Sequence, residues 1–227
     1  MRASLCVIVP TLNAGRTLEA SLGAIATEGH RFEALQLIVT DGGSTDDTLA
    51  IALAHGASIV SGQRGRGAQL QAGCAAAEAP WLLVVHADTE LATGWSEAVA
   101  RHMVASAGCA GWFEFRLDDD SIVARIWEVG VALRCAVMAL PYGDQALLIP
   151  RTLYDAAGGF RAMALMEDVD LVRRLGRQRL RAVAAAARTD AGRFRRRGYL
   201  AQSARNWSIL ARYLMGARPA QLERLYE

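Results

Sequence analysis

The chain has 227 residues, enough for one sizeable α/β domain and short for two full ones. Hydrophobic residues make up 52% and charged residues 21%, a balance that excludes an intrinsically disordered chain. The formal net charge of +2 lies too close to neutral for nucleic-acid binding by bulk electrostatics, so no nucleic-acid partner is expected.

The first half alternates short apolar runs with segments of helical periodicity. Strands are predicted at residues 5–9, 37–40, 57–60 and 81–85, and helices at 17–27, 45–55 and 69–78. Ser44 followed by Asp47 resembles a capping box, so the second helix is expected to begin there. This alternation is typical of βαβ units and of a mostly parallel sheet.

The pattern changes after about residue 108. Strands are predicted at 112–117 and 145–149, and helices at 122–140, 169–175, 199–215 and after Pro219. The segment 122–140 is the most apolar, but Arg125, Glu128 and Arg134 interrupt it, so we do not expect it to span a bilayer. The four cysteines are widely spaced and form no CxxC pair, which favours a reducing, cytoplasmic location.

Polar segments follow four of the predicted strands: residues 10–13, 41–46, 62–67 and 86–88. Ligands of open parallel sheets bind beyond the carboxyl ends of the strands, so these segments are expected to meet in one crevice. Each segment alone has a plainer explanation, because Asp or Asn after a strand commonly caps a helix.

Five motifs occur in an order that resembles the GT-A glycosyltransferases of family 2. They are Pro10-Thr-Leu-Asn13, Thr40-Asp-Gly-Gly-Ser-Thr-Asp-Asp-Thr48, His86-Ala-Asp88, Ala157-Gly-Gly-Phe160 and Glu167-Asp168. The chain also resembles a small bacterial branch described as radical-SAM/selenodomain-associated transferases. The resemblance implies an α/β GT-A fold with a mainly parallel mixed sheet. It implies one domain, 1–227, with a nucleotide-sugar half (1–107) and an acceptor half (108–227).

For the donor, the resemblance implies a UDP- or GDP-sugar. Asp41 would accept a hydrogen bond from a base N–H, as suits a carboxylate. Pro10, Thr11, Leu12 and Asn13 would line the base and ribose. Pro10 and Asn13 are equally explained as the end of a strand and the cap of a helix.

For the diphosphate, Asp88 matches the last aspartate of the family's DxD element, which holds Mg²⁺ or Mn²⁺. Ala87 would contact the nucleotide-sugar. His86 stands where the first aspartate often stands, which departs from the family's pattern; it would either ligate the metal directly or, as the plainer alternative, hydrogen-bond beside it. Arg64 and Gly67, with Arg66, belong to a glycine-rich loop that suits phosphate oxygens or, alternatively, is merely solvated.

For catalysis, the resemblance implies that Asp168 removes the acceptor hydroxyl proton in a single inverting displacement, with Glu167 orienting the base or the acceptor. The two roles are open to exchange, and both carboxylates also suit the start of a helix. Asp144 and Gln145 are candidates for binding acceptor hydroxyls, although turn chemistry explains this segment as well.

Arginines at 193 and 195–197 precede the last long helix, where Leu200, Ala204, Trp207, Ala211 and Leu214 recur at helical spacing. This pattern fits peripheral contact with the inner membrane face through the C-terminal helix. It also fits a helix packed on its own domain, or one arginine that reaches back to the diphosphate. The sequence carries no signal for an oligomeric state.

Two rival functions stay open. A nucleotidyltransferase would share a similar core, but such enzymes generally carry a basic glycine-rich loop after the first strand, where this chain has residues 10–13. A non-catalytic nucleotide-sugar binding protein is compatible with His86, whereas Glu167-Asp168 argues against it.

Overall fold

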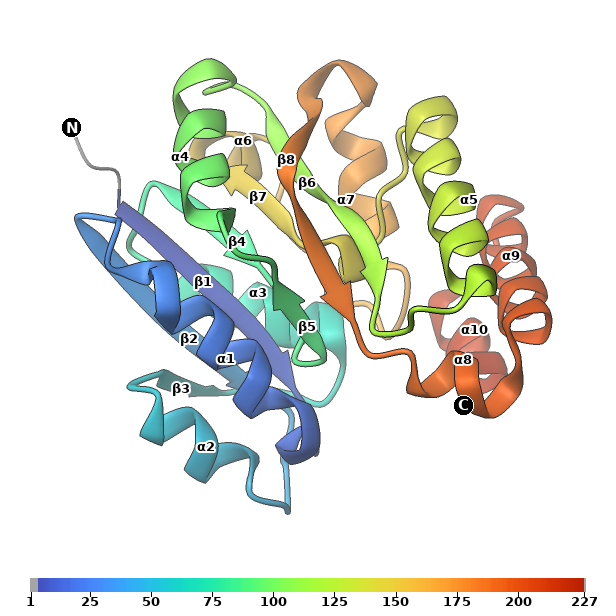
Figure 1. Cartoon of the computed structure of the whole chain (residues 1–227), viewed down its shortest axis with the longest axis horizontal. Coiled ribbons are helices and arrows are strands. Elements are labelled where there is room, and N and C mark those ends of the chain that lie inside the picture. The colour runs from blue at the N-terminus through green and yellow to red at the C-terminus, as the bar shows by residue number, and fades with distance from the viewer. Residues whose placement is uncertain (1–3, 227) are drawn as a thin grey trace.

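The computed structural model describes residues 4–226, with the side chains of all but 220, 223, 224 and 226. One sheet of eight strands runs through both halves of the chain in the order β3-β2-β1-β4-β7-β6-β8-β5 (Figure 1). Its strands are β1 (Ser4–Thr11), β2 (Ala34–Asp41), β3 (Ser58–Ser61), β4 (Trp81–Val84), β5 (Thr89–Leu91), β6 (Ala110–Leu117), β7 (Leu147–Pro150) and β8 (Leu180–Thr189).

The sheet is mixed, as predicted. Strands β3, β2, β1 and β4 are parallel neighbours. Strand β7 runs antiparallel to both β4 and β6, while β6 and β8 are parallel and the short β5 is antiparallel to β8. The carboxyl ends of β1, β2 and β4 therefore lie along one edge, where the sequence predicts a crevice.

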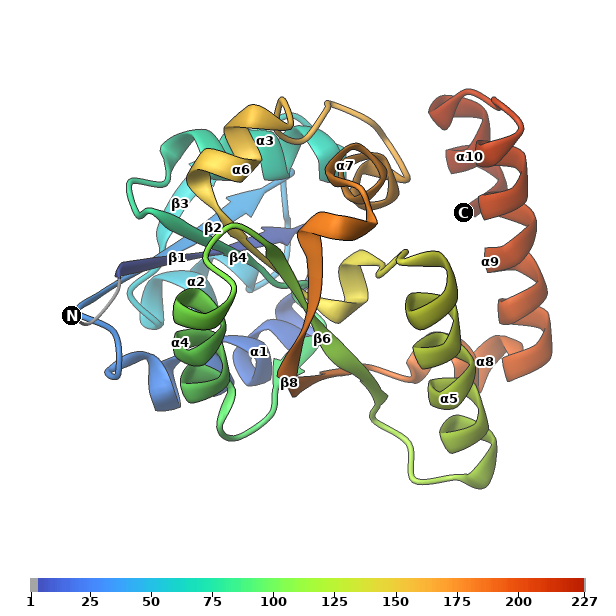
Figure 2. The ribbon, with the colours of Figure 1, turned by 90° about the horizontal axis from the view of Figure 1, so that it is seen from above.

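Helices cover both faces of the sheet (Figures 1 and 2). One face carries α1 (Gly15–Gly29), α2 (Thr48–Ala54) and α4 (Trp95–Ala105), and the other carries α3 (Arg66–Ala76), α6 (Arg151–Ala156) and α7 (Glu167–Leu175). Strand β1 serves both cores, because Leu5 and Val7 pack with the first group while Cys6 and Ile8 pack with the second. A strand that alternates between two buried faces reads as one continuous apolar run.

A second group of helices lies at the end of the sheet remote from β1–β3 (Figures 1 and 2). It consists of α5 (Ile122–Met138), α8 (Gly192–Arg197), α9 (Tyr199–Leu214) and α10 (Pro219–Tyr226). Trp127 of α5 packs against Phe194 of α8, which stacks on Tyr199 of α9, with ring centroids 5.9 and 5.3 Å apart. Within residues 4–226, no helix combines the length and apolarity needed to cross a bilayer.

The apolar stripe of α9 does not face the domain. The helix packs on the domain through Gln202, Ser203, Ile209 and Leu210. The apolar stripe that the sequence predicts points outward. The exposed members include Leu200, Ala204, Trp207, Ala211 and Leu214. The helix is therefore packed on its own domain, but with the face opposite to the one that the periodicity indicates.

The sequence patterns did not predict β5, α4, α6, β8 or α8, and they placed the start of α2 too early. Strand β8 was not predicted, because its run of alanines favours a helix; pairing with β6 and β5 on both sides holds it extended. The expected capping box is wrong, since α2 begins at Thr48 and Ser44 lies outside it. The Ser44 hydroxyl instead donates to Oδ1 of Asp41 at 2.5 Å and accepts the Asn13 N–H at 2.8 Å.

Candidate functional site

A groove with a cavity volume of about 460 Å³ opens at the carboxyl ends of the parallel strands. Seven residues singled out from the sequence line it: Pro10, Thr11, Leu12, Asn13, Arg64, Ala87 and Asp88. Volumes of roughly 300–1,000 Å³ are typical of sites for small ligands. Of the four polar segments expected to meet in one crevice, 10–13, 62–67 and 86–88 line the groove, whereas 41–46 does not.

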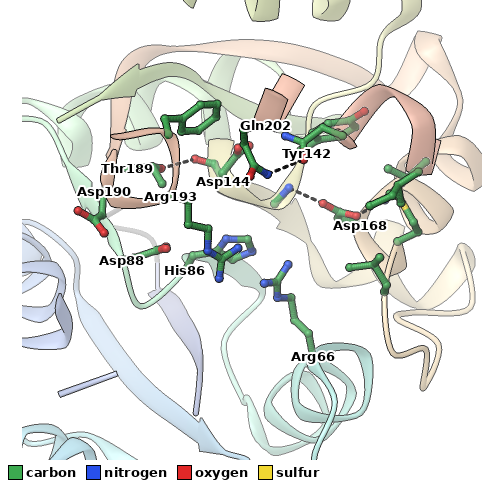
Figure 3. Close-up of a pocket in the computed structure, with 17 residues that line it drawn as sticks. Arg66, His86, Asp88, Tyr142, Asp144, Asp168, Thr189, Asp190, Arg193 and Gln202 are labelled. Atoms are coloured by element: carbon green, nitrogen blue, oxygen red, sulfur yellow. Dashed lines mark hydrogen bonds between the residues drawn. The ribbon is translucent and has the colours of Figure 1, made fainter. Parts of the chain in front are cut away.

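A second, deeper cavity adjoins this groove, and the two share Arg66, His86 and Asp88 (Figure 3). Its far wall comes from later parts of the chain, which the sheet and the helices α7–α9 bring to the same place. These residues include Tyr142, Asp144, Asp168, Thr189, Asp190, Arg193, Gln202 and Asn206. The site thus joins the two halves of the chain.

The two neighbouring carboxylates at the start of α7 face different surroundings. Consecutive residues on a helix point about 100° apart. Asp168 lines the deep cavity, whereas Glu167 is 1% exposed and lines only a small interior cavity beside it. Oδ2 of Asp168 accepts the N–H of Gly143 at 2.6 Å, and its Oδ1 accepts the N–H of Val169 at 2.7 Å. Asp168 is the carboxylate of the pair that a ligand in the cavity can reach.

Glu167 is a buried acid with little hydrogen-bonding support. Neither side-chain oxygen has a hydrogen-bond partner among the described residues. Nε of Arg66 lies 3.6 Å from its Oε1. Burial raises the pKa of Glu167 to about 7, against the opposing effect of Arg66 and with a further rise from Asp168. The carboxyl group of Glu167 thus has its pKa near neutral pH, and it is buried beside Arg66.

His86 is enclosed against the loop that carries Gly143. A Cβ atom on Gly143 would collide with Nε2 of His86 and lie 3.2 Å from Oδ2 of Asp168. Burial of the ring, together with Arg66 and Arg193, lowers the pKa of His86 well below its usual range. The imidazole is therefore neutral at pH 7, and Gly143 has no room for a side chain.

Asp144 is another acidic side chain of the deep cavity whose hydrogen bonding is incomplete. Its Oδ1 is buried without a hydrogen-bond partner in the described part of the chain. Burial raises the pKa of Asp144 to about 6; Arg134 opposes this rise, and Asp168 and Asp88 add to it. Asp144 therefore lies close enough to Asp88 and Asp168 to be repelled by both, and a cation or a proton would relieve this repulsion.

Among residues 4–226 no group of three or more His, Cys, Asp or Glu side chains is arranged to hold a metal ion by itself. A cation at Asp88 would consequently need oxygen ligands from a bound molecule. This is the usual arrangement for Mg²⁺ beside phosphates, where the protein supplies one or two carboxylates.

Besides Glu167, three of the expected site residues lie away from both the groove and the deep cavity. Asp41 is buried and accepts four hydrogen bonds: two from Ser44, one from the Gly43 N–H and one from the Thr11 hydroxyl. Burial alone would raise the pKa of Asp41, but these bonds hold it below its usual value. A carboxylate has about four acceptor positions, so a base N–H can reach Asp41 only by replacing one of them.

Gly67 and Gln145 are likewise engaged inside the protein. The Gly67 N–H donates to the Met163 carbonyl at 3.1 Å, and a side chain at Gly67 would strike the backbone of residues 161–163. Oε1 of Gln145 accepts from Arg134 at 3.0 Å and its Nε2 donates to the Phe113 carbonyl at 3.2 Å. Neither residue lines the groove or the deep cavity, so acceptor contact in this segment is left to Asp144, which lines the deep cavity.

Asn13 connects two loops and caps no helix. It has a left-handed backbone with φ of 51°, and its Oδ1 accepts the Thr45 N–H at 2.9 Å. Helix α1 begins two residues later, after Ala14. The interpretation of Asn13 as a helix cap is therefore wrong, and the residue fixes the 10–13 turn against the 41–48 loop.

Sequence reasoning did not single out Thr189, Asp190, Gln202 or Asn206. Asp190 directly follows β8, and Nη2 of Arg16 donates to its Oδ2 at 2.6 Å. Recognition of β8 would have exposed Asp190 as another polar residue after a strand. Arg193 and Arg196, from the predicted arginine run, line the groove, which agrees with the alternative that an arginine reaches the diphosphate.

Residues 6–166 match the family described as "Glycosyl transferase family 2", just short of Glu167-Asp168. Over 92 residues the chain is 38% identical to an uncharacterized glycosyltransferase of Mycobacterium tuberculosis (strain ATCC 25618 / H37Rv), and equally to one of Mycobacterium bovis. The matched stretch is 40% of this chain and 39% of each relative, so less than half of each relative's length is spanned.

Solved structures show the same fold at low identity. Residues 1–349 of S. aureus TarS superpose with a TM-score of 0.63 at 16% identity, covering 83% of this chain and 60% of that one. The complex of TarS 1–349 with UDP-GlcNAc gives a TM-score of 0.62 at 16% identity, covering 82% and 58%. Glucosyl-3-phosphoglycerate synthase from Mycobacterium tuberculosis, with Mn²⁺, UDP and glucosyl-3-phosphoglycerate, gives 0.56 at 21%, covering 83% and 70%. The architecture is GT-A.

Proposed function

Because this chain belongs to glycosyl transferase family 2, we propose that it moves a sugar, of hexosyl type, from a UDP- or GDP-linked donor to an acceptor hydroxyl with inversion. The observation that carries the proposal is the meeting of the groove beside residues 10–13 and the deep cavity at Asp168. The two cavities share Asp88, so a donor in the groove would present its sugar toward Asp168. Residues 1–107 supply most of the donor groove, and residues 108–227 supply the acceptor side.

Asp168 is the proposed general base. The Gly143 N–H holds its Oδ2 at 2.6 Å while the carboxylate still lines the cavity. It takes the proton of the acceptor hydroxyl as that oxygen forms a bond to the anomeric carbon and the bond to the diphosphate oxygen breaks. General-base catalysis of about 10²–10⁴-fold corresponds to roughly 3–5 kcal/mol of barrier.

Glu167 is proposed to position Arg66, and the roles of the two carboxylates are thereby separated. Glu167 is buried 3.6 Å from Nε of Arg66 and lines only the small interior cavity, whereas Asp168 lines that cavity and the deep cavity as well. Arg66 borders both cavities and is therefore suited to a phosphate at their junction. Arg64 is proposed as a second phosphate contact in the donor groove.

The residues present fit a divalent cation, Mg²⁺ or Mn²⁺. Asp88 and Asp144 offer hard oxygen ligands, and Oδ1 of Asp144 is buried without a hydrogen-bond partner among the described residues. When bound, the ion would stabilise negative charge on the departing nucleoside diphosphate. The synthase whose structure contains Mn²⁺ and UDP supports this proposal.

The proposed partners are the nucleotide-sugar donor, a hydroxyl acceptor and, through α9, the inner face of the cell membrane, with the protein in the cytoplasm. The UDP-GlcNAc and UDP complexes of TarS support a uridine nucleotide as the first donor to test. We also propose that the chain belongs to the radical-SAM/selenodomain-associated branch of its family, on the sequence resemblance.

The test is calorimetric titration with UDP-, GDP- and dTDP-sugars, with and without Mn²⁺, for the wild type and Asp88→Asn. One donor is expected to bind only when Mn²⁺ is present. Asp88→Asn is expected to lower the affinity of this Mn²⁺-dependent binding by at least about tenfold. Asp155→Asn is the matched control, because Asp155 is an exposed acid on α6 that lines neither cavity. The proposal fails if none of the donors binds in either condition.

A further inference from the structure

The outward surface of α5 is mostly uncharged. Its exposed positions are serine, glycine, alanine or a larger apolar residue, while Arg134 and Glu128 turn toward the protein. Arg125, whose side chain is 43% exposed, pairs with Glu128 and Asp120. Seven large apolar side chains on this face are between 40% and 79% exposed: Ile122, Val123, Ile126, Val129, Leu133, Val137 and Met138. Large apolar patches on soluble domains mark interaction surfaces.

The neighbouring helix α9 repeats the pattern. Its outward positions from Leu200 to Met215 are apolar or small except Arg212. Leu200 and Met215 are highly exposed, and the Trp207 ring is about half exposed. The two helices are in contact and lie side by side in both views (Figures 1 and 2). We call their outward positions, from Ile122 to Met138 and from Leu200 to Met215, the outer helical face.

Arginines outnumber acidic residues beside the outer helical face, where Asp118, Asp119 and Asp120 precede α5 and Nε of Arg195 lies 3.4 Å from Asp119. Residues 191–222, which contain α8 and α9, hold seven arginines and no aspartate or glutamate. Every one of the four arginines in α8 is exposed. A basic, aromatic-containing helix with an apolar outward side has the composition of segments that rest in the headgroup region of anionic membranes.

We propose that the outer helical face docks on an anionic lipid bilayer, with α5 as its main apolar contact and the exposed Arg197 and Arg212 on the lipid headgroups. This extends the membrane contact proposed for α9 and adds α5, but lipid binding itself does not require transfer activity. Phe194, Gln202, Asn206 and Ile209 line the deep cavity from α8 and α9. Under the proposed function, an acceptor held in the bilayer would therefore enter the deep cavity past α8 and α9.

A second copy of the chain is a poorer occupant. A two-fold contact places the same surface of each copy against the other. Two segments with seven arginines and no acid each would then face one another, which like-charge repulsion disfavours. An anionic bilayer meets the apolar face and the arginines together.

The experiment is co-sedimentation of the whole chain, without donor or metal, with vesicles of phosphatidylcholine alone or containing phosphatidylglycerol. Binding is expected only to the anionic vesicles and is expected to fall at high salt, since the arginine contribution is screened. The double variant Ile126→Glu with Leu133→Glu should weaken binding by at least about tenfold. Each change removes a large apolar side chain that is exposed in the free protein and would be buried in the bilayer. Arg212→Glu should weaken it less.

Leu53→Glu on α2 and Val104→Glu on α4 are the matched controls, because both side chains are exposed, at 62% and 85%, on other helices. They should bind vesicles as the wild type does, and circular dichroism checks that all variants are folded. Two outcomes overturn the proposal: folded wild type that does not bind anionic vesicles, or a dimer in light scattering that only the α5 variant dissociates. Because no sugar is present, a failed transferase assay leaves this result unaffected.

Discussion

The main-chain N–H of Gly143 donates a hydrogen bond of 2.6 Å to Oδ2 of Asp168. This contact joins the loop after α5 to the first turn of α7, and it orients the carboxylate without a second side chain. The same glycine leaves room for the ring of His86, so residue 143 lies next to both a residue of the donor groove and the proposed base.

Asp168→Asn should lower the rate of sugar transfer by about 10²–10⁴-fold, because the amide cannot take the acceptor proton. Donor affinity should change little, since Asp168 lines the deep cavity and is absent from the lining of the donor groove. Single-turnover transfer and donor titration measure the two quantities separately. A variant with near-normal turnover would assign the base elsewhere.

Gly143→Ala should reduce transfer by at least about tenfold, because the added methyl group displaces His86 or Asp168 and small misplacements are costly. Overpacking should also cost about 1–3 kcal/mol of stability. Gly23→Ala is the control, because Gly23 lies in α1 with open space around it. That change should leave activity intact and stabilise α1 slightly. Equal activity of the two variants would contradict the proposed role of residue 143.

Glu167→Gln should flatten the pH dependence of stability. The pKa of Glu167 rises from 4.5 to about 7 on folding, so the unfolded chain releases this proton first as pH rises. The wild type is thus expected to lose stability between about pH 4.5 and 7, by up to roughly 3 kcal/mol from this group. Asp144, with its pKa raised to about 6, adds a decline of the same sign that the variant retains.

Urea unfolding of both proteins across this range measures the difference. At pH 4 the Glu167→Gln variant should be as stable as the wild type or less stable. Its free energy of unfolding, relative to that of the wild type, should then increase steadily up to pH 7. The surface change Glu78→Gln is the control and should run parallel to the wild type. A constant gap between wild type and Glu167→Gln would show that Glu167 ionises as an ordinary acid.

Arg174→Ala should destabilise the fold by about 2–3 kcal/mol, because it removes charged hydrogen bonds in a largely enclosed place. Arg174 donates to Asp170 at 2.7 Å and to the carbonyls of Ala157 and Gly159, which joins α7 to the Gly158-Gly159 loop. Its neighbour Arg173 is exposed, so Arg173→Ala should change stability little. Thermal unfolding compares them, and equal melting temperatures would contradict this account.

Much of the site follows from local sequence. The apolar runs at residues 5–9 and 81–85 form neighbouring parallel strands, and their following residues, 10–13 and 86–88, meet at one edge because parallel strands end together. Periodicity likewise predicts α1, α3, α5, α7 and α9 close to their observed bounds. These features depend on the spacing of residues near one another in the chain.

Other features were decided only by tertiary structure, because they depend on contacts between distant segments. The alanines of β8 are extended only through pairing with β6 and β5, and this brings Asp190 and Arg193 to the site. The sequence contains Glu167-Asp168, but packing of α7 decides that Glu167 is enclosed and Asp168 lines the cavity. Periodicity finds the apolar stripe of α9, yet only the position of the helix on its domain determines that the stripe points outward.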